Sequence, residues 1–250
     1  KKLFSKIFVL LLVVGLLFAV APTGQAQAQT TLCVNTDGAG GCYTSIQSAI
    51  TAASAGDTIT VAAGTYTETF EVNKSVSLIG AGRDVTTIIA GDPADGTIDV
   101  SAAGVTISGF KVTNTSLAGV KADGIYVMGG ADNCTITNNE ISGNGQNGIS
   151  IVSSNNTVTG NTITGNSTNS AKGAGVALFN GGNTIQFNTI TGNAGFGGIG
   201  SVSTTANNIS NNWWGSATGP THGSNPSGTG DKLWTNQLIS LLTYSPWLAN

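Results

Sequence analysis

Glu71, Asp99 and Tyr126 stand at matching points of three similar stretches of the sequence, where each lies between two apolar residues. If these stretches form neighbouring parallel strands, the backbones of Glu71 and Asp99 lie about 4.8 Å apart and the three side chains point outward. Hydrolysis of a glycosidic bond needs two carboxylates at a defined separation. Like charges this close disfavour joint ionisation unless a cation or a network of hydroxyl groups offsets them. This column is therefore the candidate ligand or cation face.

Two charged residues before Tyr126 extend the candidate face. Asp123 and Lys121 belong to the segment that leads into this strand, so we expect them to form one wall, with Tyr126 as a stacking floor for a sugar ring. We expect no cofactor, and a weakly held Ca²⁺ at the carboxylates stays an open alternative. One His, one Met and three Cys cannot build the usual transition-metal sites, so no other metal is expected.

The elements that position these residues repeat along the chain. A phrase of the form Asn-Thr-Ile-x-x-Asn-x-Ile returns between residues 133 and 214, and a fainter copy precedes it. Its first apolar centres recur at intervals of 22 to 29 residues, at Ile107, Ile136, Val158, Ile185 and Ile209. Repeats of this length are typical of solenoids, in which each unit contacts only its neighbours.

The order of residues within each repeat predicts the type of solenoid. Each copy holds two short runs of strand-forming residues with one apolar centre, and a third run follows a variable loop. Three short strands per coil give a triangular parallel β-helix, in which each strand pairs with its copy in the next coil. Asparagine recurs where a tight corner needs a left-handed backbone and where stacked amides can form a ladder. These residues are Asn139, Asn161, Asn188 and Asn212.

These residues resemble a known superfamily. The repeated phrase, together with residues 57–66 and 76–80, is similar to the right-handed parallel β-helix superfamily that includes pectin lyase-like proteins. The ending, residues 212–220 with 244–248, is similar to closing segments of secreted bacterial and archaeal surface proteins of this fold. The resemblance implies an all-β chain folded as a single right-handed parallel β-helix. It implies no single activity, because the superfamily contains lyases, hydrolases and non-catalytic members.

Four segments are expected along the chain. Residues 1–28 have the Lys-rich start, the apolar run and the small residues of a signal peptide. Residues 29–56 form an N-terminal cap, with an amphipathic helix that begins after Thr44 or Ser45 and covers the first coil. Residues 57–212 form the β-helix, and residues 213–250 form a C-terminal capping segment.

The C-terminal segment holds all four Trp residues of the chain, which are Trp213, Trp214, Trp234 and Trp247. One interpretation is that their indoles bury the last coil, and Trp214 occupies an inward position of the repeat. The other is a platform on which sugar rings stack. The two interpretations can hold for different Trp residues.

Cysteine usage agrees with export. Cys33 and Cys42 bracket a Gly-rich loop that is flexible enough for them to form a disulfide in an oxidising compartment. Cys134 falls in an inward column, so we expect a buried thiol that packs as a small apolar group. Together with the signal peptide, this pattern predicts a secreted or cell-surface protein.

The composition excludes several classes of protein. Only 8% of the 250 residues are charged, and the formal net charge is −3. The chain therefore lacks the basic field that holds nucleic acid, and it has too few charges for a disordered protein. Outside the signal peptide no stretch is apolar enough to span a membrane. We expect a monomer whose partner is a polysaccharide.

Three functions are compatible with these features. The first is a non-catalytic secreted or cell-surface β-helix protein that binds carbohydrate, favoured by the low charge and by the lack of a convergent set of titratable groups. The second is a polysaccharide lyase or glycoside hydrolase that uses Glu71 and Asp99. The third is ice binding through paired outward Thr residues, an array that Lys111, Glu140 and Gln186 interrupt. We favour the first over an enzyme, and the enzyme stays open as the alternative.

Overall fold

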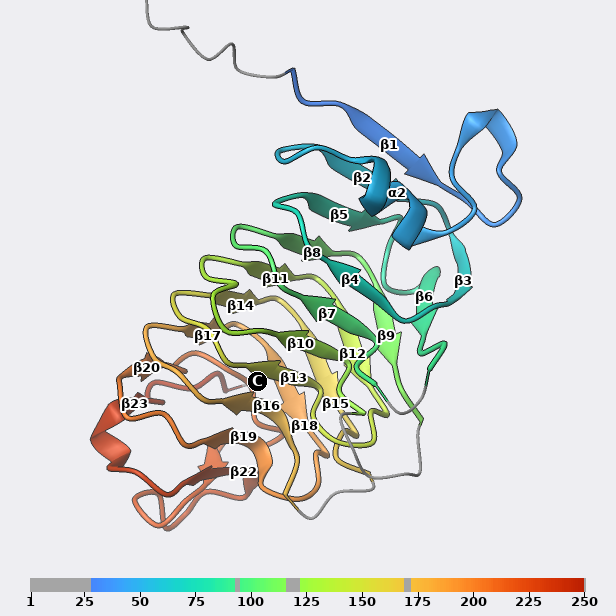
Figure 1. Cartoon of the computed structure of the whole chain (residues 1–250). Helices are drawn as coiled ribbons and strands as arrows, with labels where there is room; N and C mark the ends of the chain where they lie inside the picture. Colours follow the sequence, from blue (N-terminus) through green and yellow to red (C-terminus); the bar gives the residue numbers. More distant parts are fainter. Residues whose placement is uncertain (1–27, 93–94, 116–121, 169–171, 250) are drawn as a thin grey trace, which may run out of the picture.

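The computed structural model describes residues 28–92, 95–115, 122–168 and 172–249. The expected signal peptide, residues 1–28, lies outside these ranges except for its last residue. Figure 1 shows strands stacked along one axis in three sheets, and successive coils pair in parallel. The predicted β-helix with three-strand coils is therefore confirmed. No helix in the described ranges is long and apolar enough to cross a lipid bilayer.

The three sheets are named A, B and C here. Sheet A has nine strands: β1 (Thr31–Val34), β2 (Thr58–Val61), β5 (Ser77–Gly80), β8 (Thr106–Ser108), β11 (Thr135–Thr137), β14 (Thr157–Thr159), β17 (Thr184–Gln186), β20 (Asn207–Asn208) and β23 (Leu242–Thr243). Sheet B has six strands: β3 (Gly64–Thr67), β6 (Thr86–Ile89), β9 (Lys111–Thr113), β12 (Glu140–Ser142), β15 (Thr162–Thr164) and β18 (Thr189–Thr191). Sheet C has eight strands: β4 (Phe70–Val72), β7 (Ile98–Val100), β10 (Ile125–Val127), β13 (Ile149–Ile151), β16 (Ala174–Leu178), β19 (Gly197–Ser201), β22 (Gly230–Thr235) and β21 (Pro220–Thr221).

Alternation along each short strand decides which side chains enter the core. In β14, Val158 is buried, while Thr157 and Thr159 on either side of it are half-buried. Val158 lies in register with Ile136 of the preceding coil and with Ile185 of the next, so the alignment of the repeats is confirmed. Columns of such side chains form one continuous core. Each buried aliphatic side chain contributes roughly 1.5–3 kcal/mol.

The predicted asparagine ladder lies buried at the corner between sheets A and B. The side-chain Oδ1 of Asn161 accepts hydrogen bonds from the backbone N of Asn139, at 2.9 Å, and from its Nδ2, at 3.2 Å. The same two bonds join Asn161 to Asn188 and Asn188 to Asn212. The amides therefore satisfy backbone donors that the turning chain leaves without a strand partner.

The left-handed backbone lies one residue earlier than predicted. The residues before the four ladder asparagines have positive φ: Asn138 (55°), Gly160 (67°), Phe187 (57°) and Asn211 (57°). The ladder asparagines are thus needed for their amides, while the preceding residue turns the chain. Sequence spacing alone did not separate these two neighbouring roles.

Two further ladders that we did not predict run along the other corners. Asn144, Asn166 and Asn193 follow the strands of sheet B and bond amide to amide. This ladder ends on the carboxylate of Asp231, whose Oδ2 accepts from the backbone N and Nδ2 of Asn193 at 3.0 and 2.9 Å. The other ladder precedes the strands of sheet A and contains Asn156, Asn183 and Asn207.

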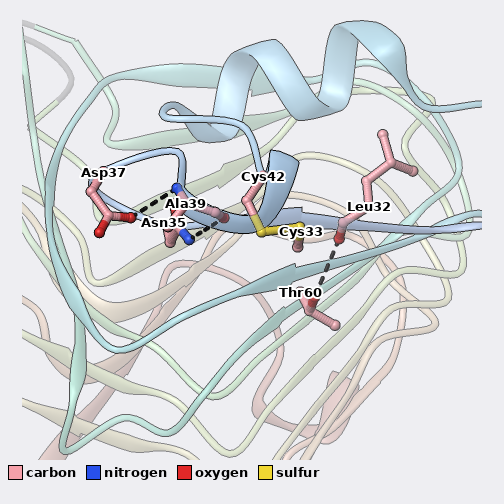
Figure 2. Close-up of a disulfide and its surroundings, with 7 residues drawn as sticks. All are labelled: Leu32, Cys33, Asn35, Asp37, Ala39, Cys42 and Thr60. Carbon is pink, nitrogen blue, oxygen red and sulfur yellow. Dashed lines mark hydrogen bonds between the residues drawn. A yellow bond between two sulfur atoms is a disulfide. The ribbon is translucent and has the colours of Figure 1, made fainter.

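A helix and a disulfide loop close the first coil. The helix α2 (Ile46–Ala52) begins after Ser45, whose Oγ accepts from the backbone N of Ser48 at 3.2 Å, and its apolar face is part of the core. Figure 2 shows the disulfide between Cys33 and Cys42, with an S–S distance of 2.05 Å, beside the short 3-10 helix η2 (Ala39–Gly41). The predicted helix and disulfide are both confirmed.

Strand pairing extends beyond the expected range of 57–212 at both ends. β1 pairs with β2 at the start, while β22 pairs with β19 and β23 pairs with β20 at the end. The 3-10 helix η3 (Ile239–Leu241) leads into β23. Trp214 is fully buried in the core, as the repeat predicted. The terminal segments are therefore part of the sheets as well as covers for them.

Two smaller predictions also hold. The Nζ of Lys111 lies 2.8 Å from Oε1 of Glu140 on the outer face of sheet B, and this bond holds the pKa of Glu140 below its usual value. The two side chains are partly exposed, so the pair contributes under about 1 kcal/mol. Cys134 is a buried thiol, and burial raises its pKa.

The central ladder can be tested by removing one amide. Asn161→Ala leaves the backbone N and Nδ2 of Asn139 without their acceptor inside the core. We expect it to lower the free energy of unfolding by about 2–5 kcal/mol, measured by urea denaturation. The matched control is Asn138→Gly, in an exposed residue with φ of 55°, which should change stability by under about 0.5 kcal/mol. Equal effects of the two variants would contradict a role for the ladder in stability.

Asp57 predicts a loss of stability in acid. Its Oδ1 accepts from the backbone N of Thr30 and its Oδ2 from that of Ser54, both at 2.8 Å, and these bonds hold the pKa of the carboxyl below its ordinary value of 3.8. The stabilisation is complete above that value and disappears as the pH falls through the lowered folded-state pKa. Asp57→Asn should therefore lower the melting temperature at pH 7, and the difference from the wild type should shrink toward pH 2. A difference that does not vary with pH would rule out this role of the charge.

Candidate functional site

The predicted outward column exists on sheet C and is longer than expected. Glu71 pairs with Asp99, and Asp99 pairs with Tyr126. The column continues through positions 150, 177 and 200, as the alternation predicted, and then reaches Trp234 in β22. In Figure 1 these strands lie side by side along the front of the molecule. The column is thus continuous in register, but Ser150, Ala177 and Gly200 in its middle are buried.

Glu71 is exposed at the N-terminal end of this face. One of its carboxylate oxygens accepts a hydrogen bond from the Ser101 hydroxyl in the loop after β7. Its backbone N donates to Oε1 of Gln47 in α2 at 2.9 Å. Glu71 is therefore tied both to the next coil and to the capping helix.

Asp99 is half-buried and lies close against its own strand. A Cβ added at Gly96 would stand 2.6 Å from Oδ1 of Asp99 and 3.7 Å from Cβ of Tyr126. The absence of a side chain at Gly96 makes room for this carboxylate. Glu71 and Asp99 are adjacent in register, as predicted. The Asp99 carboxylate, however, lies close to Gly96 in the loop before β7.

The expected wall is not formed by Asp123. This residue is only 4% exposed, and its carboxylate lies against Ser150 of the outward column. Oδ1 accepts from the backbone N and Nδ2 of Asn147 at 2.8 and 3.0 Å, and Oδ2 accepts from the Ser150 hydroxyl at 2.7 Å. Asp123 does lie beside the column, but this network buries its carboxylate, so it offers no exposed wall. Lys121, the other predicted wall residue, lies outside the described residues.

Other groups that could support catalysis lie away from the carboxylate column. Among the described residues no three His, Cys, Asp or Glu side chains gather closely enough to hold a metal ion. His222 lies in the C-terminal segment, where its Nδ1 is 2.7 Å from the Ser224 hydroxyl. Arg83 lies at the corner between sheets A and B, with Nη1 3.4 Å from the carbonyl oxygen of Gly160. Neither side chain belongs to the Glu71 and Asp99 pair.

A second feature of sheet C is an aromatic hollow near its C-terminal end. Phe196 and Trp234 stack with ring centroids 4.0 Å apart and planes 7° apart. They line a hollow of about 130 Å³ together with Phe179, Lys172 and Gln146. Phe179 is 45% exposed at its rim. The hollow is thus lined by aromatic residues together with Lys172 and Gln146.

Small residues of the column create this space. Ala177 and Gly200 occupy the two outward positions before Trp234 and also line the hollow. A Cβ added at Gly200 would lie 3.3 Å from Cβ of Phe196, which places the Phe196 side chain over this glycine. Aromatic rings held at such a surface suit stacking against the apolar face of a sugar ring.

The sequence contained a signal that Trp234 lies in a strand, but the Gly and Pro content of the segment obscured it. β22 has buried Leu233 in register with Ile199, and Trp234 follows it on the outward side. The alternation of Lys232, Leu233 and Trp234 is that of a strand.

The other Trp residues have different roles. Trp247, for example, stacks on Tyr244 with centroids 6.3 Å apart, and its Nε1 donates to the carbonyl oxygen of Ala217.

Solved structures with a similar arrangement have low sequence identity to this chain. A pectin methylesterase from carrot is 17% identical, with a TM-score of 0.45, and the match covers 82% of this chain and 61% of that protein. A pectin methylesterase from Aspergillus niger is 20% identical, with a TM-score of 0.41, covering 73% of this chain and 60% of that one. The ORF18 protein of Geobacillus virus E2 is 17% identical, with a TM-score of 0.43, covering 65% and 34%.

The chain thus spans about a third of the virus protein and about 60% of the two esterases. No curated protein sequence matches it. The family described as "Right handed beta helix region" matches residues 72–222. This match covers more than half of the chain and agrees with the parallel sheets, so the chain belongs to the right-handed β-helix family.

Proposed function

We propose that this protein is a non-catalytic secreted or cell-surface β-helix protein that binds carbohydrate on the outer face of sheet C. The observation that carries the proposal is the stack of Phe196 and Trp234 at a hollow. Phe179 is a further exposed aromatic residue, and Lys172 and Gln146 are polar residues that also line the hollow. A few polar groups around an aromatic surface are typical of sites that fix the orientation of a ligand.

The shape of sheet C suits a polymer. Its outward column runs from Glu71 to Trp234 in successive rungs about 4.8 Å apart. An extended polysaccharide lying along this axis would pass Tyr126 and then the loop residues that cover Ser150 before it reaches the hollow. The protein would then bind a chain of sugars with its strongest contacts at one end.

Two features support a location outside the cytoplasm. The disulfide between Cys33 and Cys42 forms in oxidising compartments, and residues 1–28 have the pattern of a signal peptide. The secreted or cell-surface location is part of the proposal.

The enzyme alternative, a polysaccharide lyase or glycoside hydrolase, has less support. It rests on Glu71 and Asp99, which are adjacent in register. The third predicted carboxylate, Asp123, is committed to Asn147 and Ser150 inside the fold. Release of soluble sugars from a polysaccharide by the purified protein would favour this alternative.

Ice binding has one specific observation in its favour. A column on sheet A carries a hydroxyl or amide side chain at all nine rungs: Thr31, Thr58, Ser77, Thr106, Thr135, Thr157, Thr184, Asn208 and Thr243. The neighbouring column is broken by Ile79 and Gln186. Regular hydroxyls can order water, but the broken second column makes this the weaker proposal. Absence of thermal hysteresis would exclude it.

Carbohydrate binding can be tested with one tryptophan on sheet C and one on sheet B. Trp234→Ala should weaken retention on immobilised polysaccharides at least about tenfold, because it removes the ring that forms the stack. Trp213→Ala is the control, since Trp213 pairs with Thr189 at the edge of sheet B. A panel of plant and bacterial polysaccharides should be scored for both retention and product release. Retention that both variants keep, or product release by the wild type, would contradict the proposal.

Calcium addition tests the predicted cation site. We expect calcium to leave the melting temperature unchanged, because Glu71 and Asp99 offer far fewer than the roughly six to eight oxygens that Ca²⁺ takes. A calcium-dependent rise that Asp99→Asn abolishes, without loss of stability in chelator, would instead establish a weak site at this pair.

A further inference from the structure

Phe187 occupies a position where the other coils use glycine or asparagine. It follows β17 at the corner between sheets A and B and has φ of 57°. The equivalent residues of neighbouring coils are Gly109, Asn138, Gly160 and Asn211, all with positive φ. Glycine has no Cβ to strain in this region, and asparagine tolerates it, but a bulky aromatic residue does so at an energetic cost.

The Phe187 side chain also stays in solvent. It is 56% exposed, so burial within its own fold does not offset the backbone strain. Strain held at an exposed residue is a reason to look for a binding role. The ring stands on the ridge opposite sheet C, so it is separate from the aromatic hollow described above.

The same edge of sheet A carries an apolar hollow at its other end. Its volume is about 370 Å³, and its lining includes the disulfide of Cys33 and Cys42 with Val61, Ile79 and Ala81. These residues lie at or near the carboxyl ends of β1, β2 and β5, just as Phe187 follows the carboxyl end of β17. Along the axis the hollow and the ring are roughly 20–30 Å apart.

Opposite charges accompany the two features. The Arg83 guanidinium lies 3.4 Å from the carbonyl oxygen of Gly160 and 3.4 Å from the Thr162 hydroxyl. Gly160 is one rung from Phe187, because its backbone N donates to the Phe187 carbonyl oxygen at 3.1 Å. At the hollow, Asp37 is exposed in the disulfide loop shown in Figure 2, where its Oδ1 accepts from the backbone N of Ala39.

We propose that two copies of this chain form an antiparallel dimer along this ridge, with Phe187 of each copy inserted in the apolar hollow of the other. Around a two-fold axis, the ring of each copy can meet the hollow of the other copy. The contact then occurs twice and closes as a dimer. The same arrangement brings Arg83, beside the ring, toward Asp37, beside the hollow of the second copy. The sequence led us to expect a monomer, and this surface argues for the dimer.

The dimer is tested by analytical ultracentrifugation of the purified protein over a range of concentrations, without polysaccharide. The wild type should be a dimer, and Phe187→Asn should be a monomer. Phe179→Asn, at an exposed ring on sheet C, is the matched control and should leave the dimer intact. At a dilution where both proteins are monomeric, Phe187→Asn should also raise the melting temperature by about 2–4 °C, because the corner strain is relieved.

Charge reversal gives a second and independent readout. Arg83→Asp and Asp37→Arg should each raise the dimer Kd about tenfold or more, and the double variant should recover most of the loss. A monomeric wild type, or a dimer that Phe187→Asn leaves unchanged, would overturn the proposal. Failure of the double variant to recover would overturn the antiparallel pairing of Arg83 with Asp37.

Discussion

Hydrogen bonding between identical positions of successive coils is the interaction on which this structure depends. Three-residue strands are too short to hold a coil alone, and each coil must also turn three times. At the turns the strand ladder is interrupted, and unpaired buried amides would be costly. The asparagine ladders replace the missing bonds, since each side chain accepts from one coil while its own amide continues the chain of bonds. This constraint explains why the corners repeat so faithfully while the loops vary.

A scaffold held in this way leaves its outward side chains largely free to differ. Most outward positions of sheets A and B carry Thr or Ser, which suit a strand that faces water. Function is therefore best sought where the outward residues depart from this pattern. The stack of Phe196 and Trp234 is one departure, and Phe187 in a left-handed corner is another. The first adds aromatic surface where small residues open a hollow, and the second holds an exposed ring against the local backbone preference.

Features that depend on periodicity could be predicted from the sequence, whereas features that depend on packing within a loop could not. The register of Glu71, Asp99 and Tyr126 was predictable, because alternation in a strand fixes which side each residue faces. The burial of Asp123 was not, since the repeat does not specify how a variable loop packs. The strand that contains Trp234 was missed because it lies among glycines and prolines that mark loops, although it belongs to sheet C. The position of the left-handed residue was wrong by one for a related reason. Both Asn138 and Asn139 are asparagines, and only the hydrogen bonds separate the residue that turns the chain from the residue that bonds across coils.

The buried carboxylate of Asp123 bears on the choice between binding and catalysis. Its two oxygens accept three hydrogen bonds from Asn147 and Ser150, so it acts as an acceptor inside the scaffold. Asp231 does the same at the end of the ladder that contains Asn193, and Asp57 does so between the cap and the first coil. The fold thus uses several of its few acidic residues to satisfy donors where an amide column or a strand stops. A carboxylate whose oxygens accept such bonds serves the scaffold and is not presented to a ligand at the surface. These commitments are the reason that the proposed function rests on the aromatic hollow and not on the acidic residues.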